Sequence, residues 1–196
     1  MDSSRFETFI DAILAIMLTV MVLKIPQPET LTFAGIWDLR VMHFAYFLSF
    51  IVIFSVWDHH RKLFVVLKEI SNTVIAIYAV LIFIITLVPF FTAWVAHEPY
   101  AVLPELMYGL IFLLVNILFI LATRVAVKHD TYNDLVDDIS FNEVLFLNLG
   151  LFIAGAILTL IGFPLSMLIM CLLTVITWNV IPHIQKTYVI GDDHGN

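Results

Sequence analysis

The chain opens with the stretch RFETFIDAILAIMLTVMVL, residues 5–23, in which Arg5, Glu7 and Asp11 precede an uncharged run. The run ends at Pro26 and has no small-residue cleavage site, so we expect a retained membrane helix rather than a cleaved signal peptide. Asp11 lies inside this apolar segment. Because ionisable groups are costly in hydrocarbon, we expect Asp11 to face a bundle interior or an aqueous path.

The composition extends this interpretation to the whole chain. Of 196 residues, 62% are hydrophobic and 13% are charged, whereas soluble domains have about half apolar and about a quarter charged residues. Mean hydropathy is +1.03. The net charge of −7 offers no basic stripe for phosphates, which argues against a nucleic-acid partner. The single cysteine, Cys171, excludes a disulfide framework within the chain and is expected to be a small core hydrophobe. The class is an all-α integral membrane protein.

Six segments are long and apolar enough to cross a bilayer, which takes about 20 residues. Pro89 is expected to kink the third, and Gly162-Phe163-Pro164 predicts a tight hairpin between the last two. We predict one transmembrane domain over residues 1–190 and a disordered tail at 191–196. The predicted spans cover residues 5–25, 39–62, 70–96, 104–127, 141–161 and 164–187.

The distribution of basic residues predicts the orientation. With six spans, one side of the membrane holds only Lys24 and Arg40. We therefore expect both termini in the cytoplasm and a multi-pass protein of the cell (plasma) membrane. The other side, which holds the termini, carries Arg5, Arg61, Lys62, Lys68, Arg124, Lys128 and Lys186.

The first span divides into two faces when its residues are placed in steps of about 100°. Asp11 shares its face with Leu14 and Leu18. A narrow uncharged stripe, called here the outer stripe, faces another way and contains Ala12, Ile16, Thr19, Val20 and Leu23.

Two interpretations of the outer stripe remain open. In the first, the stripe contacts lipid or another helix. In the second, stripes from several subunits surround an axis, where Ile16, Val20 and Leu23 form a hydrophobic constriction and Thr19 offers oxygens to an ion. Asp11 has a structural role in both.

The second span ends in Trp57-Asp58-His59-His60. Adjacent histidines point about 100° apart on a helix, so they do not chelate one metal ion as an i, i+4 pair does, and we expect no metal site. We expect one of the two to turn inward and bond Asp11 or Asn72, with a possible sensitivity to pH. No catalytic motif and no Thr-Val-Gly-Tyr-Gly filter is present, so we expect neither an enzyme nor a cofactor.

Three motifs resemble the transmembrane protein 175 family, which includes the lysosomal potassium channel of animals and single-repeat prokaryotic relatives. Arg5-x-x-x-Phe9-Ile10-Asp11 resembles the opening Arg-x-x-x-Phe-Ser-Asp, with Ile10 in the place of serine. Trp57-Asp58-His59-His60 resembles the tryptophan and paired histidines that end the second span of the family, although the family often has Asn where Asp58 stands. Leu87-Val88-Pro89-Phe90-Phe91-Thr92 resembles the stretch Leu-x-Pro-Phe-x-Thr.

The resemblance implies a homotetramer of six-helix subunits in which the first span lines a central pore. It implies a passive cation channel that prefers potassium and has no carbonyl filter. By register from the motif aspartate, Ile16 becomes the bottleneck and Thr19 the selectivity residue, with Leu23 continuing the stripe. A structural polar network is then expected from Arg5, Asp11, Trp57, His59, His60 and Asn72.

Two other functions compete with a channel. A proton-coupled secondary transporter would use Asp11 with His59 or His60 as a proton relay, although the chain has no inverted repeat. A non-conducting membrane scaffold or sensor is the third possibility.

Overall fold

The computed structural model describes residues 3–66, 71–129, 141–163 and 165–177. All regular elements in these ranges are helices, which confirms the all-α prediction for this part of the chain. The tail 191–196 and the second half of the predicted sixth span lie outside the described residues. The helices are α1 (Ser3–Val22), α2 (Phe33–Asp38), α3 (Arg40–Val66), α4 (Asn72–His97), α5 (Val102–His129), α6 (Phe141–Ile161) and a further helix, Ser166–Thr177.

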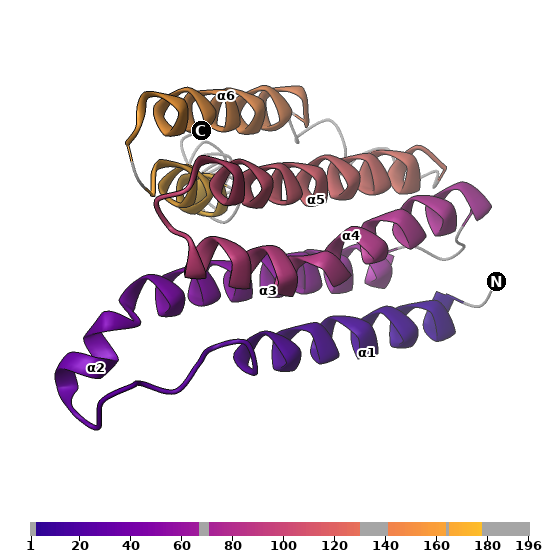
Figure 1. Cartoon of the computed structure of the whole chain (residues 1–196). Helices are drawn as coiled ribbons and strands as arrows, with labels where there is room; N and C mark the ends of the chain where they lie inside the picture. The colour runs from indigo at the N-terminus through magenta and orange to yellow at the C-terminus, as the bar shows by residue number, and fades with distance from the viewer. Residues whose placement is uncertain (1–2, 67–70, 130–140, 164, 178–196) are drawn as a thin grey trace, which may run out of the picture.

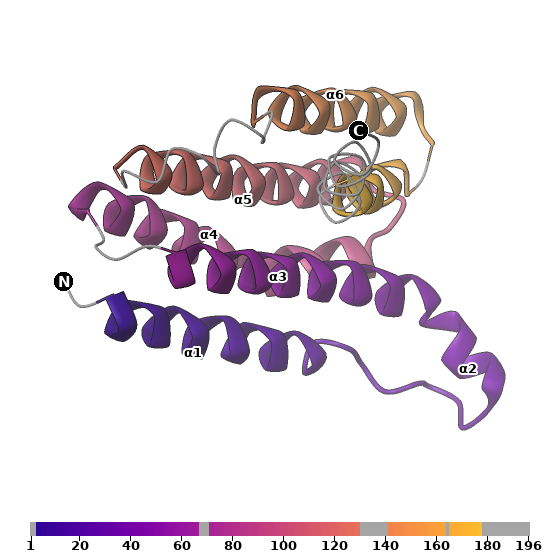
Figure 2. The same cartoon turned by 180° about the vertical axis from the view of Figure 1, so that it is seen from behind.

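The long helices form a layered bundle with α1 at one edge and α6 at the opposite edge (Figures 1 and 2). α1 packs against α3 and α4, α4 packs against α5, and α5 packs against α6. The first residues of α1, the last residues of α3 and the first residues of α4 share one end of the bundle, and α2 lies at the other (Figure 1). Among the described helices, none covers the outer face of α1.

Four helices, α3 to α6, are long and apolar enough to cross a membrane. α1 is 20 residues long but carries Arg5, Glu7 and Asp11 along its first half. It anchors to the bundle through an apolar inner face in which Phe6, Leu14 and Met21 are buried. An apolar face of this kind is typical of a helix that packs on the surface of a bundle.

The short helix α2 was not expected from the sequence. Thr32 is its N-cap and accepts a hydrogen bond from the backbone N–H of Gly35. A Cβ on Gly35 would come within 2.4 Å of the Thr30 carbonyl oxygen, so only glycine fits the approach of the preceding loop. At six residues, α2 is too short to produce an amphipathic pattern that sequence reasoning can detect.

The predicted break at Gly162 is a Schellman turn at the end of α6. The Phe163 N–H donates to the Leu158 carbonyl oxygen and the Gly162 N–H to that of Thr159, with Gly162 at a φ of 97°. The Ser166–Thr177 helix then appears nearly end-on where α5 and α6 lie along the page (Figures 1 and 2). The described residues 166–177 thus lie at an angle to α5 and α6, and the tight hairpin between the fifth and sixth spans stays a prediction.

A buried carboxyl group, Glu105, fastens this turn to the first part of α5. Its Oε1 accepts from the Leu165 N–H at 2.6 Å, and its Oε2 accepts from the Met167 N–H and the Thr159 hydroxyl. Glu105 is 1% exposed. Because helix N–H groups at a first turn lack partners within the helix, the carboxyl group caps the start of Ser166–Thr177.

Candidate functional site

The outer stripe of α1 is exposed on the subunit. Ile16 is 54% exposed and Leu23 is 79% exposed, while Ala12 and Thr19 are also exposed and Val20 is half-buried. The stripe lies on the face of α1 that no helix in the described part of the chain covers. Its role in ion conduction stays a prediction.

Thr19 is the hydroxyl of the outer stripe, and its conformation is set by its own helix. Its Oγ1 donates to the Ile16 carbonyl oxygen at 2.8 Å. With the proton used inside the helix, the oxygen keeps its lone pairs at the exposed surface. The stripe can therefore offer an acceptor between the two bulky aliphatic side chains Ile16 and Leu23, and it carries no charge.

Behind the stripe, an aromatic cluster ties α1 to α3 and α4. His60 is fully buried, and its Nδ1 lies 3.2 Å from the Tyr78 hydroxyl oxygen. The His60 ring packs against Phe64 with centroids 4.2 Å apart and the ring planes tilted by 45°. Phe6 of α1 packs on both Phe64 and Tyr78 at 5.9 and 5.8 Å. The end of α1 that carries the charges is thus held by rings from three helices.

The two histidines face different neighbours. His60 turns toward α1 and α4, whereas the His59 Nδ1–H donates to the Ser55 carbonyl oxygen at 2.8 Å, and the His59 ring meets Phe119 of α5. The inward histidine therefore bonds Tyr78, a residue that sequence reasoning missed. The available signal was the hydroxyl of a tyrosine inside an otherwise apolar span, because such a group needs a hydrogen-bond partner.

Asp11 is not bonded to His60 in this structure. Among the described residues, Asp11 Oδ1 and His60 Nε2 are both buried and lack hydrogen-bond partners. An unpaired buried acceptor and an unpaired ring nitrogen are costly in a low-dielectric interior. A proton, a water molecule or a small movement of α1 against α3 that gave these two atoms a partner would therefore stabilise the structure.

The other predicted network residues lie at the surface of the same end of the bundle. Arg5 is exposed. Trp57 is half-buried, with the Arg61 guanidinium 5.3 Å above its ring. Asn72 is exposed in the first turn of α4, next to the N-cap Ser71. Arg5 and Asn72 lie in the first turns of α1 and α4, while Asp11 and His60 each have a buried polar atom.

A second buried network, also missed by sequence reasoning, joins α3, α4 and α5. The Ser49 hydroxyl lies 2.8 Å from that of Thr92 and 2.9 Å from that of Tyr108. Thr92 also donates to the Val88 carbonyl oxygen, one residue before Pro89 in the helix. This network fixes α4 around its proline and keeps the helix supporting α1 in place. No group of three His, Cys, Asp or Glu side chains within the described ranges could hold a metal ion.

The family model described as "Endosomal/lysosomal potassium channel TMEM175" matches residues 5–89. A potassium channel of Chryseobacterium sp. (strain P1-3) is 29% identical over 68% of this chain and 69% of its own length. Potassium channels of Chamaesiphon minutus and Streptomyces collinus are 29% and 27% identical, over 60% and 49% of this chain and 63% and 48% of theirs. The described family and all three relatives are channels, which confirms that the chain is not an enzyme.

The fold also matches a solved structure. The crystal structure of a lysosomal potassium-selective channel TMEM175 homolog from Chamaesiphon minutus superposes with a TM-score of 0.72 at 23% identity. The match covers 90% of this chain and 95% of that one. At this identity, the likeness establishes the shared helical fold.

Proposed function

We propose that the chain, which resembles the TMEM175 family of potassium channels, forms a passive, potassium-preferring cation channel with a hydrophobic constriction on α1. Four copies would place their α1 helices around a central axis, with Ile16, Val20 and Leu23 narrowing the path and Thr19 contributing to selectivity. Conduction by this route requires no cofactor; potassium is the permeant ion.

One observation carries this proposal: α1 presents an uncharged aliphatic stripe with a single hydroxyl on the face that the described residues of the subunit leave exposed. Bulky aliphatic rings can close an aqueous path by dewetting, and a hydroxyl between them can replace part of the hydration shell of an ion. The charged groups of α1, Arg5, Glu7 and Asp11, all precede the stripe's constriction residues in the sequence.

We further propose six spans per subunit, both termini in the cytoplasm and residence in the cell membrane. The described helix ends support the orientation: the start of α1, which carries Arg5, lies at the bundle end where α3 ends a few residues after Arg61 and Lys62. An excess of basic residues at one end is typical of the cytoplasmic side. A residue network around Asp11 and His60 would then anchor α1, together with Arg5, Trp57, His59 and Asn72.

The gate assignment is tested by ion flux into liposomes that contain the purified protein. We expect Ile16→Asn to raise sodium flux about tenfold, equivalent to lowering the barrier by about 1.4 kcal/mol, because a polar ring admits water and hydrated ions. Ile157→Asn is the matched control, since Ile157 is 51% exposed on α6 and Ile16 is 54% exposed on α1. Equal sodium flux in the two variants would contradict the gate assignment.

The unpaired atoms of Asp11 and His60 favour one alternative, a proton-coupled transporter that uses these groups as a relay. It predicts saturable uptake that acidifies the liposome lumen and is abolished by Asp11→Asn. The channel proposal predicts non-saturating potassium flux that survives Asp11→Asn in correctly folded protein. Folded tetramers with no flux of either kind would favour a scaffold.

A further inference from the structure

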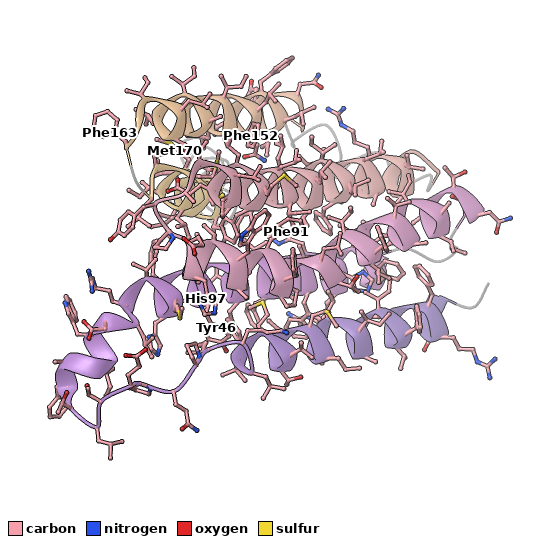
Figure 3. All side chains as sticks on the ribbon, viewed as in Figure 1. Tyr46, Phe91, His97, Phe152, Phe163 and Met170 are labelled. Carbon is pink, nitrogen blue, oxygen red and sulfur yellow. The ribbon has the colours of Figure 1, made fainter. Side chains whose placement is uncertain are left out.

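A cavity of about 20 Å³ lies between α5, α6 and the Ser166–Thr177 helix. Its apolar walls include Phe152 and Met170, which Figure 3 shows in the space between α6 and α5. Three polar side chains also line it: Asn116 of α5, Asn148 of α6 and Thr174. None of these residues belongs to α1, so the cavity is separate from the outer stripe.

Asn148 is the decisive residue of this cavity. Its side chain is 2% exposed, and within the described part of the chain neither its Nδ2 nor its Oδ1 has a hydrogen-bond partner. A buried carboxamide that lacks all its partners is rare, because the lost hydrogen bonds to water are not replaced. In the apolar interior of a membrane protein this loss is greater still.

The other two polar side chains, Asn116 and Thr174, keep free hydrogen-bonding capacity inside the cavity. The Thr174 hydroxyl donates to the Met170 carbonyl oxygen at 3.0 Å, which leaves its oxygen as an acceptor. Asn116 uses one N–H of its Nδ2 to reach the Phe112 carbonyl oxygen at 2.7 Å. Asn116 also lines a smaller cavity of about 10 Å³ toward Ser55 of α3, so it connects both sides of α5.

We propose that the larger cavity binds an ordered water molecule that bridges Asn148 to Asn116 and Thr174. Water both donates and accepts hydrogen bonds, and a buried water typically makes about three of them. About 10–15 Å³ of such cavity space is enough for one water molecule, and 20 Å³ is too small for a lipid headgroup or an organic ligand. The lining has no carboxylate, which disfavours a bound metal cation.

The bound water would link three helices that meet inside the hydrocarbon region. It would act as a structural part of the subunit that remains hydrated whether or not the pore conducts. The proposal does not depend on the channel function, because it rests on the unpaired carboxamide and on the size of the cavity.

The test is water-edited solid-state NMR of uniformly ¹⁵N-labelled wild-type protein in lipid bilayers. We expect magnetisation from water to reach the Asn148 side-chain NH₂ group, with the exposed Asn72 as positive control and the backbone N–H of Leu48, which is 0% exposed, as negative control. Transfer no faster than to Leu48 would mean a dry cavity and would overturn the proposal. Transfer from lipid protons instead of water would overturn it as well.

Two variants sharpen the result. Asn148→Leu fills the cavity and removes the polar group, so we expect the Asn116 NH₂ group to lose its water transfer. Asn148→Ser leaves room and a hydroxyl, so we expect that transfer to persist. Loss of transfer in both variants, or in neither, would contradict the bridging geometry. If Asn148→Leu does not fold, the wild-type measurement and Asn148→Ser still decide.

Discussion

α1 and α6 form the two outer edges of the bundle (Figure 1), and both expose aliphatic side chains on one face. The exposed face of α6 includes Phe146, Ile153, Ile157 and Leu160, with no polar atom among them. The exposed face of α1 also carries large apolar side chains, Phe9, Ile16 and Leu23, but among them lie the hydroxyls of Thr8 and Thr19. Exposure alone therefore does not distinguish the two faces; they differ in the hydroxyls that the face of α1 carries and that the exposed face of α6 lacks after its first turn.

The two edges are also held by different forces. α6 and the turn after it depend on the buried carboxyl group of Glu105 and its donors. α1 depends on apolar contacts, with Phe6, Leu14 and Met21 buried against α3 and α4. This contrast predicts two effects on stability. Removing a buried polar group should destabilise the α6 edge most, and removing buried apolar volume should destabilise the α1 edge.

The largest effect is expected from Glu105→Leu. The change leaves the N–H groups of Leu165 and Met167 buried without acceptors, which we expect to cost about 3–5 kcal/mol of stability. Thermal unfolding in detergent measures the loss. Glu98→Leu is the control, because Glu98 is exposed at the end of α4 and should change the midpoint little. Equal midpoints for both variants would show that the Glu105 contacts do not hold the α6 edge.

The next effect is expected from Leu14→Ala on the inner face of α1. Leu14 is 1% exposed, so its truncation leaves a cavity and should cost about 3 kcal/mol. Leu160→Ala on the exposed face of α6, where the side chain is 67% exposed, should cost much less. The same unfolding assay compares them. A larger loss of stability from Leu160→Ala would contradict the assignment of Leu14 to a buried face and of Leu160 to an exposed one.

A smaller effect is expected from Tyr78→Phe, which removes the hydroxyl that meets His60 Nδ1 at 3.2 Å. Loss of one buried hydrogen bond should cost about 1 kcal/mol. Tyr100→Phe provides the comparison, since Tyr100 is 69% exposed beyond α4. If the two variants unfold at the same temperature, the aromatic cluster anchors α1 without help from the His60–Tyr78 bond.

The sequence predicted α1 and α3 to α6, because long apolar runs with few charges leave few alternatives in a membrane protein. It also predicted that one histidine turns inward, since two adjacent histidines cannot share a face. It did not identify His60, because the choice depends on Tyr78, which lies 18 residues away on another helix. The Glu105 contacts were missed for the same reason: Thr159 and Leu165 lie 54 and 60 residues away.

The angular analysis of the first span placed Ile16, Thr19 and Leu23 on one face, and that face is exposed on the subunit. Their neighbour Val20 is half-buried, because it lies at the edge of the stripe, between the exposed face of α1 and the face that packs on the bundle. The helical periodicity of the sequence therefore identified which side of α1 is exposed on the subunit. It could not decide what covers the face, since a single subunit does not contain its own partners.

The central claim, that the outer face of α1 meets water while that of α6 meets lipid, is tested most directly by cysteine accessibility. Cys171 is the only native cysteine, so Ile16→Cys and Ile157→Cys can each be made in a Cys171→Ser background and exposed to a charged, membrane-impermeant thiol reagent. We predict that Ile16→Cys reacts and that its modification blocks potassium flux, while Ile157→Cys does not react. Modification of Ile157→Cys alone, or of Ile16→Cys without any change in flux, would contradict the account.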